Sequence, residues 1–499
     1  MSATLPALLA APAVAALVLV LLPRRAGDRA AAPVGLLAAL VTLGLAIVAA
    51  VAVGTSGAAA QLDVDLPWVP QLGLRFHLGV DGISLPLLLL TAGIGVLVAV
   101  HTYTARPERV RSYTVLLLLV QLGSLGTFLS LDLLLFFVFF EVVLAPMWFL
   151  IDGWGGAGRR RAANRFILMT LLGSAVMLVG LLLVAVTAGT TDIVALSAAH
   201  GSGLSAGVQL AAALLIGGGL AVKVPMWPLH VWLPDAHTAA PTAGSVLLAA
   251  VLLKLGTYGF LRLVVPVVPE GFTRIAPGVA VLATVGILWG GYACLAQVDL
   301  KRLIAFSSVA HMGFVMLAIA TLSGAGLQGA MFGNVAHGLI TGLLFFVVGA
   351  IKHRYGTSDL RTMPRGLYGR APHLGALLLF AGVATLGLPG LAGFWGEFLT
   401  LYGAYQPAPE LSRLLYLVLL VGACVGVLLA AAYVLRMLRR VVQGDPGGEP
   451  APADVSVGEW LAWAPLVVAI VVLGLWPQLL LGVTAPATDA LLAALGVAR

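Results

Sequence analysis

The stretch GGGLAVKVPMWPLHVWLPDAH, residues 217–237, decides the fold of this chain. It joins an apolar run to a lysine, Lys223, and then to two prolines, Pro225 and Pro228. Each proline removes a backbone N–H donor and clashes with the preceding helical turn. Inside a membrane, backbone groups freed in this way are tolerated only where protein or water satisfies them. The stretch therefore predicts a broken membrane helix with an ionisable group at the break.

The composition of the whole chain agrees with a membrane environment. Of the 499 residues, 61% are hydrophobic and 9% are charged, and the mean hydropathy is +1.07. A soluble globular protein would carry roughly 25% charged residues. The fold class predicted here is an all-α, multi-pass integral membrane protein.

Apolar runs of about 20 residues predict 14 membrane helices along the chain. They lie near residues 5–22, 33–53, 83–103, 113–131, 133–151, 166–188, 207–233, 241–264, 276–297, 302–322, 327–351, 373–404, 412–435 and 460–482. The first run lacks a cationic n-region, so we interpret it as a retained helix and not as a cleaved signal. The Pro- and Gly-rich segment Gly444–Asp454 predicts a flexible loop. A short surface helix is expected from Thr488 onward.

The distribution of basic residues predicts the orientation of these helices. With the N-terminus outside, the loops that face the cytoplasm carry 20 Lys and Arg residues, and the outer loops carry five. The positive-inside rule therefore places both termini on the outer side. Lys301 and Arg302 are expected to be interface anchors, and Asp132 is expected to have a capping or an interface role. Because the basic residues are dispersed along one membrane face, the net charge of +7 does not indicate a nucleic-acid partner.

A second proline-interrupted stretch, ATLGLPGLAGFWGEFL at residues 384–399, carries Glu397. Discontinuous helices at corresponding positions of two halves are typical of transporters built from inverted repeats. Glu141 precedes Lys223 by 82 residues, and His311 precedes Glu397 by 86. The second pair lies five predicted helices after the first. Because successive helices cross the membrane in opposite directions, an odd offset makes the second copy inverted relative to the first.

The predicted repeats are helices 4–8 and 9–13, with helices 7 and 12 discontinuous. The predicted division has four parts: helices 1–3 (residues 1–112), the first repeat (113–264), the second repeat (265–440), and a loop, helix 14 and tail (441–499).

The choice of basic residue indicates proton chemistry within the membrane. Only four of the 27 Lys and Arg residues are lysine, and two of them, Lys223 and Lys254, lie inside long apolar stretches. Arginine does not release its proton in proteins, whereas a lysine removed from water has a lowered pKa and can load and release one. A charge at mid-membrane costs at least about 2.5 kcal/mol, so such a residue is a functional candidate by default.

Three longer runs carry a resemblance to a known family. They are LHVWLPDAHTAAPTAGSVLLAAVLLKLGTYGFLR (229–262), QVDLKRLIAFSSVAHMGFV (297–315) and LPGLAGFWGEF (388–398). The chain resembles the antiporter-like membrane subunits of respiratory complex I and their relatives in cation/proton antiporters, over roughly helices 3–13. Glu397 distinguishes it from sibling subunits, most of which carry lysine at the matching position.

The resemblance implies a proton relay and a place in a larger complex. It assigns the following positions to the relay: Glu141 and Lys223 as a coupling pair, Lys254 as the central group, His311 and His337 as the bridge into the second half, and Glu397 as the terminal group. It further implies a proton-translocating subunit of an NADH:quinone oxidoreductase in a bacterial plasma (inner) membrane. The expected partners are the antiporter-like chains L and N and the lipid bilayer. FMN, iron–sulfur clusters and quinone are expected in partner subunits, and no cofactor is expected in this chain.

Several alternatives remain at this point. The chain could instead belong to a multi-chain Na⁺/H⁺ antiporter, to a membrane-bound hydrogenase complex, or to a structural scaffold. A buried Glu–Lys pair could be purely structural, although such pairs stabilise poorly relative to apolar packing. His311 and His337 could be satisfied core residues.

Two sequence patterns resemble ligand-binding sites but lack residues that such sites need. His230 and His237 lie near Asp235, but they lack a convincing third and fourth metal ligand. Gly153, Gly155 and Gly158 spell GxGxxG, but a dinucleotide site needs a βαβ unit and an acidic residue about 20 positions later. We interpret this motif as a cytoplasmic turn. Both cysteines lie in apolar segments, so neither a disulfide framework nor a cysteine metal site is expected.

Overall fold

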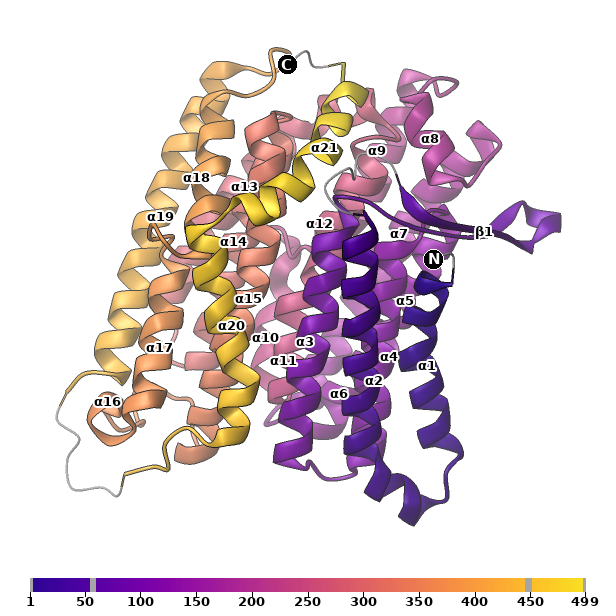
Figure 1. Ribbon diagram of the computed structural model, residues 1–499. Coiled ribbons are helices and arrows are strands. Elements are labelled where there is room, and N and C mark those ends of the chain that lie inside the picture. Colours follow the sequence, from indigo (N-terminus) through magenta and orange to yellow (C-terminus); the bar gives the residue numbers. More distant parts are fainter. Residues whose placement is uncertain (1–2, 54–59, 445–450, 497–499) are drawn as a thin grey trace.

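The computed structural model describes residues 3–53, 60–444 and 451–496, and these are mostly helical. Figure 1 shows long helices running side by side, with the indigo N-terminal helices and the orange helices α17–α19 on opposite sides of the bundle. The helices of the first half are α1 (Thr4–Leu21), α2 (Arg24–Val53), α3 (Ser84–Ala105), α4 (Val110–Leu129), α5 (Leu133–Val142), α6 (Leu144–Trp154), α7 (Arg159–Ala188), α8 (Ile193–Ala199), α9 (Ala206–Lys223), α10 (Leu233–Ala239), α11 (Thr242–Leu247) and α12 (Leu253–Gly259). Those of the second half are α13 (Pro269–Ala296), α14 (Leu300–Ala320), α15 (Gly324–Tyr355), α16 (Leu367–Arg370), α17 (Pro372–Thr385), α18 (Ala392–Tyr405), α19 (Arg413–Val441), α20 (Val457–Leu475) and α21 (Gln478–Ala494).

Thirteen helices of the described residues are long and apolar enough to cross a membrane. Several begin earlier than predicted: α2 begins at Arg24 and α7 at Arg159, so their arginines lie on the first helical turns and not in loops. Hydropathy detects only the apolar middle of such a helix, whereas the helix itself continues into the polar interface. The C-terminal helix α21 likewise begins at Gln478, ten residues before the expected start. Of the predicted loop after α19, residues 445–450 lie outside the described residues.

The two proline-interrupted stretches lie at helix ends. Helix α9 ends at Lys223, and a 3₁₀ turn (η2, Leu229–Trp232) leads into α10. The indole N–H of Trp232 donates to the Val222 carbonyl at 2.9 Å and so satisfies one acceptor at the end of α9. In the second stretch, α17 ends at Thr385 and α18 begins at Ala392.

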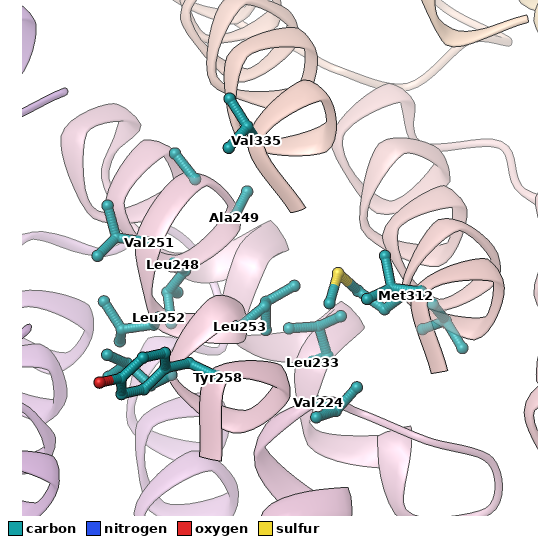
Figure 2. Packing of buried hydrophobic residues seen from close by; sticks show 14 of the residues in the cluster. Val224, Leu233, Leu248, Ala249, Val251, Leu252, Leu253, Tyr258, Met312 and Val335 are labelled. Carbon is teal, nitrogen blue, oxygen red and sulfur yellow. The ribbon is translucent and has the colours of Figure 1, made fainter. Parts of the chain in front are cut away.

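The segment that carries Lys254 departs from regular α-helix on both sides. Two π-helical segments, η3 (Leu248–Leu252) and η4 (Phe260–Val264), flank the short helix α12. Single π turns inside α-helices are rare and occur frequently at functional sites. In Figure 2, Leu248, Leu252 and Leu253 of this segment belong to one buried cluster that also contains Met312 and Val335 from the second half. Lys254 itself, between the two π-helical segments, is fully buried.

A β-hairpin precedes α3, where the sequence analysis assigned no element. Strand β1 (Gln61–Val69) pairs antiparallel with β2 (Leu74–Val80), and Figure 1 shows the hairpin projecting from the body near α1, α5 and α7. Arg75 pairs with Asp65 at 2.6 Å, and His77 contacts Asp63 at 2.8 Å and Asp192 at 3.3 Å. The first two contacts join the two strands of the hairpin, and the contact with Asp192 joins the hairpin to the segment that follows α7.

Two short backbone bridges have the same pattern. Asp132 bridges Asp192 before α5, and Asp299 bridges Asp359 before α14. The residue before the second aspartate of each bridge carries a hydroxyl that donates to the first aspartate. Thr191 donates to Asp132, and Ser358 donates to Asp299. Each residue of the second bridge follows its counterpart by 167 positions. Asp132 also accepts from the N–H groups of residues 134 and 135, which confirms its predicted capping role.

Candidate functional site

Lys254 and His337 meet in the core, although 83 residues separate them in the sequence. Nζ of Lys254 lies 2.6 Å from Nδ1 of His337 on α15 and donates to the Ala249 carbonyl at 2.5 Å. The lysine is fully buried, and the histidine is 6% exposed. The roles in this contact depend on where the proton resides: a charged lysine donates to the ring nitrogen, and a neutral lysine can accept from it. The geometry permits direct proton exchange between the two side chains.

His311 and Glu397 continue the same row of polar groups. The rings of His337 and His311 lie 6.0 Å apart between centroids, and Nδ1 of His311 lies 3.3 Å from Oε1 of Glu397. The hydroxyl of Tyr433 approaches the other nitrogen of His311 at 3.5 Å. All three predicted residues line one cavity of about 40 Å³. A buried water needs roughly 10–15 Å³, so this cavity has room for about two or three.

Close backbone packing fixes the position of Glu397. A Cβ atom at Gly396 of α18 would lie 2.7 Å from the Cα atom of Gly333 on α15, so the two helices touch through glycine. Small residues allow such approach between membrane helices. Gly387, which has a positive φ of 63°, faces the carboxylate itself: a Cβ atom there would lie 2.4 Å from Oε2 of Glu397. The sequence signal for this role is the LGLPG run between α17 and α18.

The first half is less tightly connected. Glu141 near the end of α5 is partly buried, and its Oε1 atom is buried without a hydrogen-bond partner. Nζ of Lys223 is also buried without one, and it lies 4.8 Å from the ring centroid of Phe140, the neighbour of Glu141. Within the described residues, no ion pair of 4.0 Å or less joins Glu141 to Lys223. The predicted pair is therefore close without being in contact.

Lys223 and Lys254 are separated by apolar packing. A Cβ atom at Gly256 would lie 2.7 Å from a methyl group of Val224, so α12 rests directly on the end of α9. Val224 and Leu253, the chain neighbours of the two lysines, belong to the buried cluster of Figure 2. Among the described residues no hydrogen bond links the two lysines, and a proton passing between them would need water to bridge the gap.

Two further buried groups were missed as candidates. His237 on α10 is fully buried, neither ring nitrogen has a hydrogen-bond partner, and the ring stacks on Phe345 at 4.5 Å. The prediction of Lys301 as an interface anchor is wrong, because this lysine is 3% exposed and donates to the Ala240 carbonyl. His237 follows Lys223 by 14 residues and precedes Lys254 by 17, and that proximity was the available signal for it; Lys301 has no such neighbour in the sequence.

The GxGxxG motif lies between two helices. Helix α6 ends at Trp154, and Gly158, with a φ of 73°, precedes α7. The N–H of Gly156 donates to the Ala239 carbonyl at 2.8 Å, so the turn packs against the end of α10. The interpretation as a helix-to-helix turn is confirmed.

Comparison with known proteins confirms the resemblance seen in the sequence. Residues 130–425 match the family described as NADH:quinone oxidoreductase/Mrp antiporter, TM. NADH-quinone oxidoreductase subunit M of Rhodobacter capsulatus is 40% identical over 490 residues, which cover 95% of this chain and 93% of the relative. NADH-ubiquinone oxidoreductase chain 4 of Arabidopsis thaliana is 37% identical over 451 residues, which cover 90% and 89%.

A solved structure agrees with these relatives. A chain in respiratory complex I from Thermus thermophilus with bound NADH superposes with a TM-score of 0.87 at 32% identity, over 98% of this chain and 99% of that one. The fold and the sequence thus match the same family along almost the whole length. The chain belongs to the family of membrane subunits shared by NADH:quinone oxidoreductase and Mrp antiporters, in the branch named subunit M or chain 4.

Proposed function

We propose that this chain carries protons across the membrane as a subunit of an NADH:quinone oxidoreductase, through a relay of buried ionisable side chains. The relay consists of Glu141, Lys223, Lys254, His337, His311 and Glu397, in that order. The observation that carries the proposal is the row from Lys254 through His337 and His311 to Glu397, with two close polar contacts and a cavity inside the apolar core.

The chemistry of the row suits proton transfer. Every member can gain or lose a proton, and a histidine can accept at one ring nitrogen while it donates from the other. The His337–His311 separation of 6.0 Å is too long for a direct bond, but the adjoining cavity can hold the water that would bridge it. Glu397 then serves as the terminal group of the second half.

The first half would supply the input. A carboxylate near a buried lysine favours the charged lysine, and moving the carboxylate away leaves burial unopposed and favours release of the proton. Glu141 and Lys223 are near each other without an ion-pair contact, so small displacements would change their interaction strongly. A charge change in a neighbouring subunit could drive release by this means.

The inferred topology comprises 14 membrane spans, with two inverted repeats at residues 113–264 and 265–440, an N-terminal part at 1–112 and a C-terminal part at 441–499. The matched bridges Asp132–Asp192 and Asp299–Asp359 support the repeat, because one lies in each half and the two occupy corresponding positions. The interrupted stretches after Lys223 and before Glu397 would be the discontinuous seventh and twelfth spans.

The chain is an integral membrane protein, and we infer a bacterial plasma (inner) membrane with both termini on the outer side. The basic residues on the predicted cytoplasmic loops support this orientation. Chains L and N would be its neighbours in the membrane arm, and FMN, iron–sulfur clusters and quinone would belong to partner subunits.

Replacement of Lys254 by arginine tests the proposal directly. Arginine keeps the positive charge but cannot release its proton. If Lys254 carries protons, the Lys254→Arg enzyme should lose NADH-driven pumping in membrane vesicles almost as fully as Lys254→Ala. An assembled Lys254→Arg enzyme that pumps at the wild-type ratio of protons to NADH would show that the lysine acts only as a fixed charge.

A further inference from the structure

A large cavity outside the relay is lined by arginine. It has a volume of about 980 Å³ and lies between the end of α19, the start of α14 and the segment before α16. Its five arginines are Arg361, Arg365, Arg436, Arg439 and Arg440. None of the described residues that line it is acidic. The arginines belong to the loops predicted to face the cytoplasm.

These positive charges are poorly neutralised by the part of the chain that the structure describes. Arg361 pairs with Asp359 at 2.7 Å. Arg440 donates from Nη2 to the carbonyls of Arg361 and Met363 at 3.2 and 2.9 Å, while its Nη1 is buried with no partner among the described residues. Arg436 likewise donates to a backbone carbonyl, that of residue 295. Carbonyl bonds orient a guanidinium but do not cancel its charge, so four like charges remain around one cavity.

An apolar surface leads away from the arginines along α19. Leu435 lines the cavity and is 56% exposed. The same side of the helix continues through exposed Leu414, Val418, Val421, Val425 and Leu428. These positions recur every three or four residues, which places them on one helical face. A charged cavity at the end of an apolar helical face matches a headgroup joined to acyl chains.

We propose that this cavity binds the phosphate headgroup of an anionic phospholipid, with the acyl chains along α19. Planar guanidinium groups bind phosphate oxygens through paired hydrogen bonds, which a lone lysine cannot reproduce. Basic pockets between membrane helices on the cytoplasmic side bind anionic headgroups in this way. The unpartnered Nη1 of Arg440 is a donor already in place for such an oxygen.

A second basic cavity on the same side shows the contrast. It has a volume of about 390 Å³ and contains Arg161, Arg165 and Arg302. There, Asp235 pairs with Arg165 and, at 3.0 Å, with Arg302. The single carboxylate of Asp235 thus holds two of the three arginines and cancels one charge, so two positive charges remain there against four in the larger cavity, and the proposal does not extend to it.

The test uses the whole purified complex, delipidated in detergent, with fluorescent phosphatidylglycerol as the probe. Arg365→Gln/Arg439→Gln removes two cavity charges for which no hydrogen bond is present among the described residues. Each charge near the headgroup contributes about fivefold to binding, so the double variant should bind roughly 25-fold more weakly. Arg29→Gln/Arg160→Gln removes two exposed cytoplasmic-side charges outside the cavity and should bind as the wild type does. Should the double variant not assemble, Arg439→Gln alone should still weaken binding about fivefold.

Further binding measurements distinguish an anionic phospholipid from other groups that could occupy the cavity. Phosphatidylcholine with the same acyl chains should bind at least tenfold more weakly, and inorganic phosphate should displace the lipid only at far higher concentration. Inorganic phosphate that binds as tightly as the lipid would overturn the lipid assignment. Asp445 and Glu449 follow α19 in the sequence. If Asp445→Asn/Glu449→Gln raised lipid binding more than tenfold, the carboxylates of this chain, and not a lipid, would be the groups that neutralise the arginines of the cavity. Loss of a neighbouring subunit from the Arg365→Gln/Arg439→Gln complex, with lipid binding unchanged, would point to a protein partner and refute the proposal.

Discussion

Replacement of Gly387 by alanine tests whether the position of Glu397 matters, without altering any ionisable group. Gly387 lies in the segment between α17 and α18, and its φ of 63° is unfavourable for alanine. The added Cβ atom would lie 2.4 Å from Oε2 of Glu397. Real Cβ atoms essentially never approach another heavy atom below 3.0 Å, so the carboxylate must move.

The size of the effect follows from these distances. Opening the contact from 2.4 to 3.0 Å displaces Oε2 by at least 0.6 Å. Oε1 of the same carboxylate lies 3.3 Å from His311, and that separation would change with it. A misplacement of about 1 Å can cost up to about 100-fold in a positioned reaction, so we expect proton transfer through Glu397 to fall by about tenfold. The left-handed backbone adds about 1–2 kcal/mol of destabilisation.

Gly390→Ala is the matched control for this variant. Gly390 has a φ of 91°, but the nearest atom to an added Cβ is a methyl carbon of Leu475 at 3.8 Å. Both variants thus strain the backbone, and only Gly387→Ala displaces Glu397. The assay is NADH-driven acidification of inverted membrane vesicles, followed by fluorescence quenching of an acridine dye, with assembly checked on native gels. Equal pumping by the two variants would refute the role given to the Glu397 position.

Four further substitutions address the remaining groups. Glu141→Gln keeps size and hydrogen bonding but removes the charge, and it should abolish most NADH-driven pumping in vesicles; unchanged pumping by a stable enzyme would rule out the coupling role. Lys223→Arg should be nearly as damaging to pumping as Lys223→Ala, and rescue by arginine would favour a structural anchor. Glu397→Lys should retain more protons pumped per NADH than Glu397→Ala, because the site needs a titratable group more than a given sign; alanine equal to or better than lysine would contradict this. Asp81 pairs with the buried Arg262 at 2.7 Å, and Asp81→Asn removes the charge that balances this arginine. The variant should lose about 3–5 kcal/mol of stability, measured as a lower midpoint in thermal unfolding of the purified complex. An unchanged midpoint would show that the pair does not contribute to stability.

The sequence revealed those parts of the site that depend on local chemistry. The prolines after Lys223 act on their own turn of helix, and α9 ends at that lysine. A buried lysine is rare enough in an apolar run to be noticed from composition alone, which is how Lys254 was found. Both inferences depend only on residues that are close together in the sequence.

Other features depend on contacts between distant segments and could not be found in this way. Of the π-helical segments around Lys254, η3 packs against α15 and α3 and η4 packs against α9, and nothing in LLAAVLLKLGTYGF distinguishes π from α geometry. The hairpin is tied down by bonds such as that from the N–H of Leu131 to the carbonyl of His77. Lys301 was misplaced because an apolar window cannot tell a helix end in the interface from one covered by other helices.

The apolar contact between the end of α9 and α12 has a consequence for energy conservation. A relay that was continuous from one membrane face to the other would conduct in both directions and dissipate the gradient that it builds. Val224 and Leu253, each the chain neighbour of one of the lysines, belong to the buried apolar cluster at this contact. We infer that hydrocarbon at this point insulates the two lysines from each other at rest, and that a transient chain of water would close the connection only during turnover. Leakage across the resting membrane is then limited by how rarely water enters between these two side chains.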